Sequence, residues 1–117
     1  MNQDTNIFIQ QFKKGDQKAF DQLVLLHKDW VIGMIYNMVH NKQDAEDISQ
    51  DVFVSVYFSL NKFKGNASFK TWLYRIVVNK VNNHFRKLKL KNMFSFELSE
   101  VDNVKASYND EDKIFAE

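Results

Sequence analysis

Residues 44–60 read DAEDISQDVFVSVYFSL, and this stretch decides the fold. On a helical wheel at about 100° per residue, one arc is apolar and comprises Ala45, Ile48, Val52, Phe53, Val56 and Leu60. The opposite arc mixes polar and apolar side chains: Asp47, Gln50, Asp51, Val54, Tyr57 and Phe58. We therefore predict a helix from Gln43 or Asp44 to about Leu60, with a second face suited to a partner helix. The alternative is that Val54 and Phe58 pack on the N-terminal helix of the same domain.

Three further helices are predicted around this one. The first covers residues 5–14, with Ile7, Phe8 and Phe12 as its apolar stripe and Gly15 as its stop. The second follows Asp16 as N-cap and ends near His40, and its buried face comprises Phe20, Leu23, Val24, His27, Val31, Met34, Ile35 and Met38. After a loop over residues 61–67, Ser68 caps a last helix that runs to about Lys91. Its core arc is Leu73, Tyr74, Val77, Val78, Val81 and Phe85.

Composition bounds the class of protein. The chain has 117 residues, 44% of them hydrophobic, with no Cys, no Pro and three Gly, which favours one all-α domain and excludes a disulfide framework or a thiolate metal site. We expect a compact bundle of about four helices over residues 1–92, followed by an acidic linker over 93–117. Because no apolar run approaches the length of a membrane span and the N-terminus lacks signal-peptide character, we expect a soluble, cytoplasmic protein without membrane insertion.

The net charge of +1 conceals blocks of opposite sign. Residues 62–91 contain nine basic side chains and no acidic one, whereas residues 97–117 contain seven acids and two lysines. On the last helix, the side opposite the core presents Arg75, Asn79, Asn82, Asn83 and Arg86, with Trp72 and Ile76 at its border. Guanidinium groups neutralise phosphates, amides bond base edges and an exposed ring stacks on a base, so this pattern favours nucleic acid over the alternative of a solvated basic face.

The loop before the last helix has an aromatic residue on either side. Phe63 and Phe69 bracket Gly65, Asn66, Ala67 and Ser68, which predicts a small polar pocket with aromatic walls at a helix N-terminus. Such a pocket could hold an unstacked base. The alternative is that the two Phe side chains anchor the loop on the core.

Four motifs then occur in a specific order: GDQKAFDQL over residues 15–23, DAEDISQDVF over 44–53, LNKF over 60–63 and SFKTWLYRI over 68–76, followed by Asn79. Together they resemble region 2 of bacterial sigma factors, in the extracytoplasmic-function (ECF) group of the sigma-70 family. The resemblance covers about residues 8–90, and the order and spacing of its motifs are far more specific than one short motif.

The resemblance implies a non-enzymatic initiation factor, without cofactor or metal, that binds core RNA polymerase and recognises and melts the promoter −10 element. The helix over residues 44–60 would dock on the clamp helices, a coiled coil of the largest polymerase subunit. Gln50 falls on the key contact position of the family, and the predicted polymerase-binding residues are Asp47, Gln50, Asp51, Val54 and Phe58. An anti-sigma factor is a further possible partner.

The resemblance also implies that the loop and the last helix bind the non-template strand and capture a flipped base. Asn79, Ser68 and Phe69 fall where the family forms that pocket. We infer that Lys64, Lys70, Arg75 and Arg86 contact the DNA backbone. The complete predicted DNA-binding set is Phe63, Lys64, Gly65, Asn66, Ser68, Phe69, Lys70, Trp72, Arg75, Asn79, Asn83 and Arg86.

Two departures from the family pattern affect these expectations. Primary sigma factors carry two adjacent tryptophans where this chain has Trp72 and Leu73, so melting should depend more on base capture than on an aromatic wedge. The helix-turn-helix domain for the −35 element is absent, and residues 109–117 resemble only the beginning of its first helix, so we expect a fragment of a longer factor.

Two other functions compete with this one. An enzyme would use Asp44, Asp47 and Asp51 as metal ligands, but His27, His40 and His84 do not supply the Glu-x-x-His pattern of helical carboxylate sites. A helical protein-interaction or adaptor domain without DNA binding is the stronger alternative. It predicts binding with little salt dependence, whereas phosphate contacts require a steep one.

Overall fold

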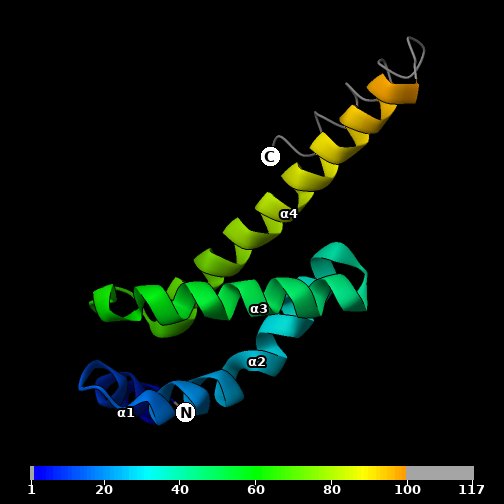
Figure 1. The fold of residues 1–117 in the computed structure, drawn as a ribbon. Helices are drawn as coiled ribbons and strands as arrows, with labels where there is room; N and C mark the ends of the chain where they lie inside the picture. The colour runs from blue at the N-terminus through cyan, green and yellow to red at the C-terminus, as the bar shows by residue number, and fades with distance from the viewer. Residues whose placement is uncertain (1, 100–117) are drawn as a thin grey trace. The chain divides into compact units, whose positions relative to one another are not determined.

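The computed structural model describes residues 2–99, which form four α-helices and one short 3₁₀-helix and contain no strand (Figure 1). The chain divides into two compact units, residues 1–80 and residues 81–117. Residues 100–117, where most of the acidic linker was expected, lie outside the described part of the chain. The predicted all-α class is therefore confirmed over the residues described.

Local capping sets the first two helices. Helix α1 spans Asn2–Lys13 and gives way to Gly15, whose φ of 105° is a backbone conformation that only glycine adopts without cost. Asp16 then caps α2, Gln17–Val39, because its carboxylate accepts a 3.0 Å hydrogen bond from the backbone N–H of Lys18. The predicted N-cap is confirmed, and α1 begins three residues earlier than expected.

A tight corner joins α2 to α3. His40 takes a left-handed conformation with φ of 57°, and its N–H donates to the carbonyl of Tyr36 at 2.8 Å. The next residue, Asn41, already caps α3, Lys42–Ser59, since its side-chain oxygen accepts a 2.9 Å hydrogen bond from the N–H of Asp44. Helix α3 continues into the 3₁₀-helix η1, Leu60–Lys62.

Helix α4, Phe69–Ser99, begins where Ser68 was expected to cap it. The Ser68 hydroxyl accepts a 3.2 Å hydrogen bond from the N–H of Thr71 and lies 3.0 Å from the Thr71 hydroxyl. The predicted end near Lys91 is wrong, because the helix continues to Ser99. Residues 92–99 contain no Gly or Pro that would stop it.

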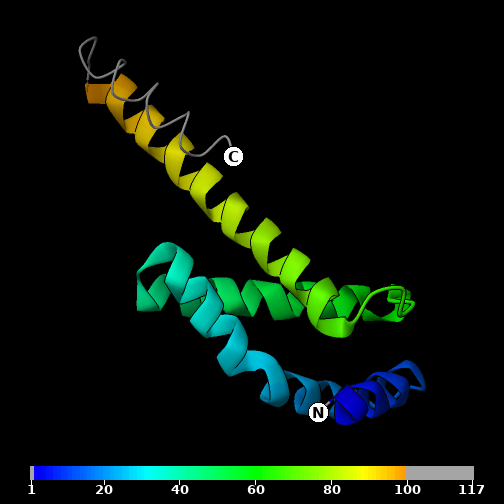
Figure 2. The same ribbon diagram turned by 180° about the vertical axis from the view of Figure 1, so that it is seen from behind.

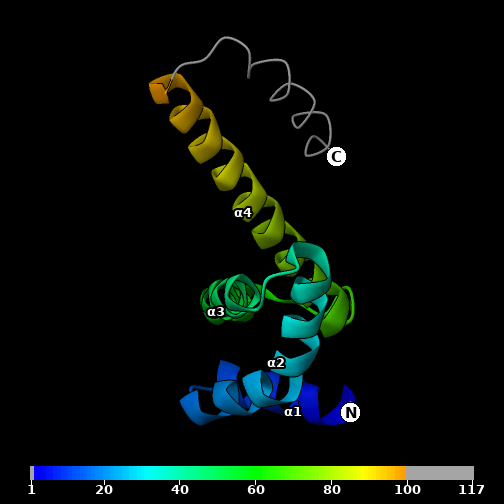
Figure 3. The ribbon, with the colours of Figure 1, turned by 90° about the vertical axis from the view of Figure 1, so that its right-hand side faces the viewer.

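The core of residues 1–80 forms where α1 and α3 pack on α2 (Figures 1 and 2). Figure 3 looks nearly along α3, with α1 and the first part of α2 on one side of it. The largest fully buried side chains come from α2, α3, η1 and the first turns of α4: Leu23, Val31, Ile35, Val52, Val56, Leu60, Leu73 and Val77. Burying apolar surface of this kind is the main force that holds the helices together.

Several predicted core residues lie elsewhere. Ile7 and Tyr74 are nearly half exposed, whereas Thr5, Ile9 and Phe12 hold the buried positions of α1. Eight others are only partly buried: Phe8, Phe20, Val24, Met34, Met38, Phe53, Val78 and Phe85. A helical wheel shows which side of a helix is buried, but the packing of the partner helix determines how many side chains on that side are covered. Among the helices of residues 2–99, none is both long enough and apolar enough to cross a bilayer.

Candidate functional site

The outer face of α3 carries the mixed side chains that the wheel predicted. Val54 is 55% exposed and Phe58 is 75% exposed, so neither packs on α1 as the alternative required. Asp47, Gln50 and Asp51 are exposed on the same helix. Asp47 accepts a 3.1 Å hydrogen bond from the amide of Gln43. Apart from Tyr57, the side chains of this second face are therefore not covered by other described residues.

Tyr57 behaves differently from its neighbours on that face. Its ring centroid lies 5.5 Å from that of Phe12 and 5.1 Å from that of Phe20, in edge-to-face geometry. Its hydroxyl donates a 2.9 Å hydrogen bond to the side-chain oxygen of Gln17. Tyr57 thus joins α3 to α1 and α2, which is the intradomain role that the alternative had given to Val54 and Phe58.

A hollow of about 650 Å³ runs between α2 and this face of α3. Val24, Lys28 and Ile32 line it from α2, and Gln50, Val54 and Phe58 are among its lining residues from α3. Sequence reasoning had placed Val24 in the core and had not singled out Lys28 or Ile32. This hollow is formed by two helices together, so Lys28 and Ile32 could be identified only once the packing of α3 on α2 was known.

The loop over residues 63–68 lies at one end of the helices of residues 1–80, near the end of α1 (Figures 1 and 2). Gly65 has a φ of 80°, so the bend there requires the freedom of glycine. Lys64, Gly65, Asn66 and Ser68 are exposed, as a binding loop requires. Phe63 is half-buried at its start, and its N–H donates to the carbonyl of Leu60 at 3.1 Å.

The aromatic residues around the loop form a cluster. Phe63 lies 5.0 Å from Trp72 and 5.9 Å from Phe69 between ring centroids, and Phe69 also lies 5.0 Å from His27. Phe69 is only 6% exposed. We therefore correct its predicted role: the buried ring anchors the loop on the core, as the alternative held. Phe63 and Trp72 remain partly accessible.

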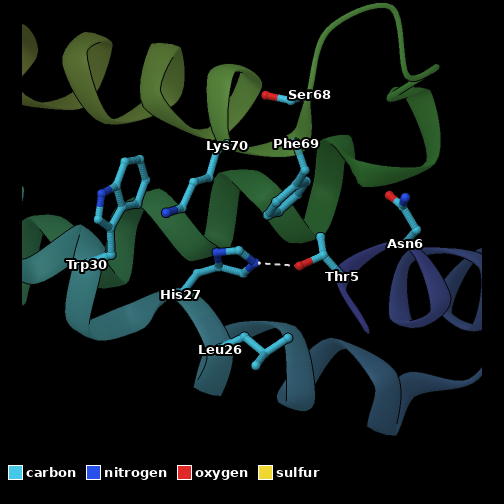
Figure 4. A pocket seen from close by; sticks show the side chains of 8 residues that line it. All are labelled: Thr5, Asn6, Leu26, His27, Trp30, Ser68, Phe69 and Lys70. Atoms are coloured by element: carbon cyan, nitrogen blue, oxygen red, sulfur yellow. Dashed lines mark hydrogen bonds between the residues drawn. The ribbon is translucent and has the colours of Figure 1, made fainter. Parts of the chain in front are cut away.

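A second hollow, of about 490 Å³, lies beside this cluster and is lined by residues of α1, α2 and the start of α4 (Figure 4). Thr5 Oγ1 lies 3.1 Å from Nε2 of buried His27, and the Lys70 ammonium lies 4.8 Å from the centre of the Trp30 ring. Burial, followed by the nearby positive charge of Lys70, lowers the pKa of His27 below its usual value of about 6.5. His27 is therefore neutral at physiological pH. Of the residues that line this hollow, only Ser68, Phe69 and Lys70 were predicted to belong to a site.

The polar side of α4 begins close to the loop. Lys70, Arg75 and Asn79 are exposed, and the Asn79 amide makes no hydrogen bond to the described residues. Asn83 and Arg86 belong to the unit that begins at Val81, where both are exposed and Arg86 donates a 2.7 Å hydrogen bond to the Asn83 oxygen. Residues 62–80 carry five basic side chains and no acid, so this surface attracts phosphate.

Metal-binding chemistry finds no support in the described side chains. Over residues 2–99, no three His, Asp or Glu side chains come together as metal ligands do. The exposed carboxylates of Asp47 and Asp51 lie on α3 beside apolar side chains instead. That setting suits a protein contact.

Comparison with known proteins decides the family. The family model of Sigma-70 region 2 matches residues 23–90. This chain belongs to the sigma-70 region 2 family. Sigma factors are transcription initiation factors and not enzymes, and the predicted resemblance to this family is confirmed.

Curated relatives belong to the same family. This region 2 chain is 41% identical over 76 residues to the RNA polymerase sigma-H factor of Pseudomonas aeruginosa, which is 65% of this chain and 39% of that protein. It is 43% identical over 81 residues to the ECF RNA polymerase sigma factor SigW of Bacillus subtilis, covering 69% and 43%. The ECF RNA polymerase sigma-E factor of Escherichia coli is 37% identical over 78 residues, with 67% and 40% covered. The chain thus spans about two fifths of the length of these relatives.

A solved structure shows the same fold. It is the NMR structure of an engineered region 2 of sigmaE in complex with GTAAAA, with a TM-score of 0.66 and 35% sequence identity. The match covers 71% of this chain and 86% of that one. The helical arrangement is therefore that of a sigma region 2 domain, while the roles of individual residues stay predictions.

Proposed function

We propose that this chain is the domain of a bacterial sigma factor that docks on the clamp helices of core RNA polymerase and recognises and melts the −10 element. The observation that carries the proposal is the presence of two different exposed surfaces on the region 2 fold within residues 1–80. The outer face of α3 is acidic and apolar, and the surface of the loop and early α4 is basic and amide-rich.

Docking on polymerase would use the outer face of α3. Phe58 and Val54 together offer apolar area that only a partner can bury, and Gln50 lies beside them in the groove between α2 and α3. Asp47 and Asp51 would pair with basic residues of the partner and would steer its approach. An anti-sigma factor that covered this face would prevent docking.

Recognition of DNA would use the loop and α4. Lys64, Lys70 and Arg75 would neutralise phosphates of the non-template strand, which positions the strand without reading its sequence. The Asn79 amide can donate and accept at once, so it can read the edge of a base that has left the stack. Support for nucleic-acid binding by this fold comes from the similar structure, an engineered region 2 of sigmaE solved in complex with GTAAAA.

Melting would follow from capture of that base. A base held in the protein no longer pairs with the template strand, so each captured base favours the open state. Phe63 and Trp72 are the partly accessible rings beside the loop, and they could stack against the captured base. Phe69 contributes by holding the loop, since its own ring is buried.

Fluorescence anisotropy tests this function. Labelled single strands that contain a −10 sequence, scrambled strands and the matching duplexes are titrated with the full chain over a series of salt concentrations. We expect the non-template strand to bind most tightly and every affinity to fall steeply with salt. Binding that ignores both sequence and salt, with retained affinity for polymerase, would instead support an adaptor domain.

A further inference from the structure

Helix α1 lies outside residues 23–90, which the family model matches, yet it directly contacts the loop over residues 63–68, which is the proposed base-capture loop. The ammonium of Lys13, in the last turn of α1, donates a hydrogen bond to the backbone carbonyl of Phe63, fifty positions later in the sequence. The same ammonium lies 6.0 Å from the centre of the Phe63 ring. A single side chain therefore contacts both the backbone and the ring of the residue that opens the loop.

The loop has little else to hold it. Residues 64–67 make no hydrogen bond within the described part of the chain, and the nearest backbone bonds belong to Phe63 and to Trp72 on either side. Gly65 adds flexibility, because glycine loses more conformational freedom on ordering than any other residue. A loop of this kind adopts a defined shape only if its ends are fixed.

Helix α1 is linked to both ends of the loop, directly at the first end and through His27 at the second. Lys13 contacts Phe63 at the first end, and Thr5 hydrogen-bonds His27, whose ring lies 5.0 Å from that of Phe69 at the second end (Figure 4). Thr5 and Phe69 are buried, so the second contact is part of the core. Lys13 is exposed, and its contact can be removed without opening the core.

We infer that Lys13 is a positioning residue for the base-capture loop: it fixes Phe63 so that the loop presents a preformed pocket to the strand. This inference rests on the proposed function and extends it to a helix that the family model does not match. Preorganisation of this kind increases affinity because less ordering remains to be done on binding. Preorganisation of the loop should strengthen binding of the captured base and should leave the contacts to phosphates unchanged.

The test compares Lys13→Met with Lys14→Met in the full chain. Both variants remove one positive charge from neighbouring exposed positions, but only Lys13 contacts Phe63. Affinities are measured for a strand with the preferred base at the captured position and for strands with the other three bases. The ratio between these affinities is the readout, because a charge that only attracts phosphate affects all four strands alike.

We expect Lys13→Met to reduce this ratio about fivefold, as the loss of one positioning hydrogen bond would, and Lys14→Met to leave it unchanged. Lys13→Arg, which keeps a donor and a cation, should restore most of the ratio. Amide relaxation measured by NMR should show Gly65 and Asn66 becoming more mobile in Lys13→Met alone. Equal ratios in the two Met variants would overturn the inference, whereas a wild-type chain that does not distinguish the four strands would overturn the proposed function itself.

Discussion

Tyr57 and Phe58 lie next to each other on α3 with ring centroids 5.2 Å apart and ring planes at 89°, and they face opposite environments. Tyr57 packs on Phe12 and Phe20 and donates a hydrogen bond to Gln17. Phe58 extends outward and is 75% exposed. One ring therefore stabilises the domain, and the other is left for a partner.

This contrast predicts the effects of substitution on the α3 face. Gln50→Ala combined with Phe58→Ala should weaken binding to a clamp-helix fragment by about 1–3 kcal/mol, because an exposed aromatic anchor is lost. The free energy of unfolding should change by less than about 0.5 kcal/mol. Calorimetric titration and chemical denaturation measure the two effects.

Tyr57→Ala is the matched control. It should lower the free energy of unfolding by about 1 kcal/mol or more, because two aromatic pairs and a hydrogen bond are lost together. If the Gln50 and Phe58 double variant loses stability to the same extent, the exposed ring is structural and the docking face is not the one proposed.

Phosphate contacts should appear in the salt dependence. Arg75→Ala and Arg86→Ala should each weaken binding of all single strands similarly and reduce the slope of log affinity against log salt by roughly one unit. Lys18 is an exposed cation at the start of α2, so Lys18→Ala serves as the control and should leave the slope unchanged. A slope that stays constant in either Arg variant would remove that residue from the DNA path.

Asn79→Ala should act on base choice. Loss of an amide that reads a base edge should cost about 1–3 kcal/mol for the preferred base at one position and much less for the other three bases. Affinities for four strands that differ only at the captured position measure this. Asn37→Ala, which removes an exposed amide from α2, should affect none of them. Equal losses on all four strands would make Asn79 a brace for the loop.

His27 should make stability depend on pH. Because burial and Lys70 lower its pKa in the folded state, the unfolded chain binds more protons as pH falls through about 6.5. The free energy of unfolding should therefore be fully retained above this value and should decline as pH falls toward the folded-state pKa. Denaturation curves between about pH 7.5 and pH 5 test this.

His27→Gln is the comparison for the pH series, since it keeps a polar group opposite Thr5 but does not titrate. The variant should lose the part of the pH dependence that belongs to this site. Identical pH profiles would show that His27 accepts a proton in the folded state as readily as in the unfolded one.

Much of this fold could be predicted from local signals. Asp16 and Ser68 cap their helices through hydrogen bonds that span only two or three residues, so the sequence alone indicates them. The Asn41 cap was not predicted, because Asn41 was expected only to end the preceding helix. Helical periodicity placed Val54 and Phe58 opposite the core arc of α3, but it left open whether they pack on α1, and their exposure in the structure decided this.

The contacts between distant segments could not be predicted in this way. Lys13 and Phe63 meet only because α1 packs beside the loop, and no periodicity connects them. Phe69 had two possible roles, and the packing of its ring on His27 decided between them. Tyr74 has the helical spacing of a core residue, but it lies at the edge of the buried face of α4, where the neighbouring helices do not cover it.

The pair of Lys70 and Trp30 has a practical consequence. The emission of an indole depends on the charge beside it, and here an ammonium lies 4.8 Å from the ring centre. A nucleic-acid strand that drew the Lys70 side chain away would change the fluorescence of Trp30 without any attached dye. Trp72, whose ring centroid lies 5.0 Å from that of Phe63, would respond to the loop instead. The chain therefore carries two tryptophan fluorophores, and replacing either Trp by Phe would separate the signal of the phosphate-binding side chain from that of the loop.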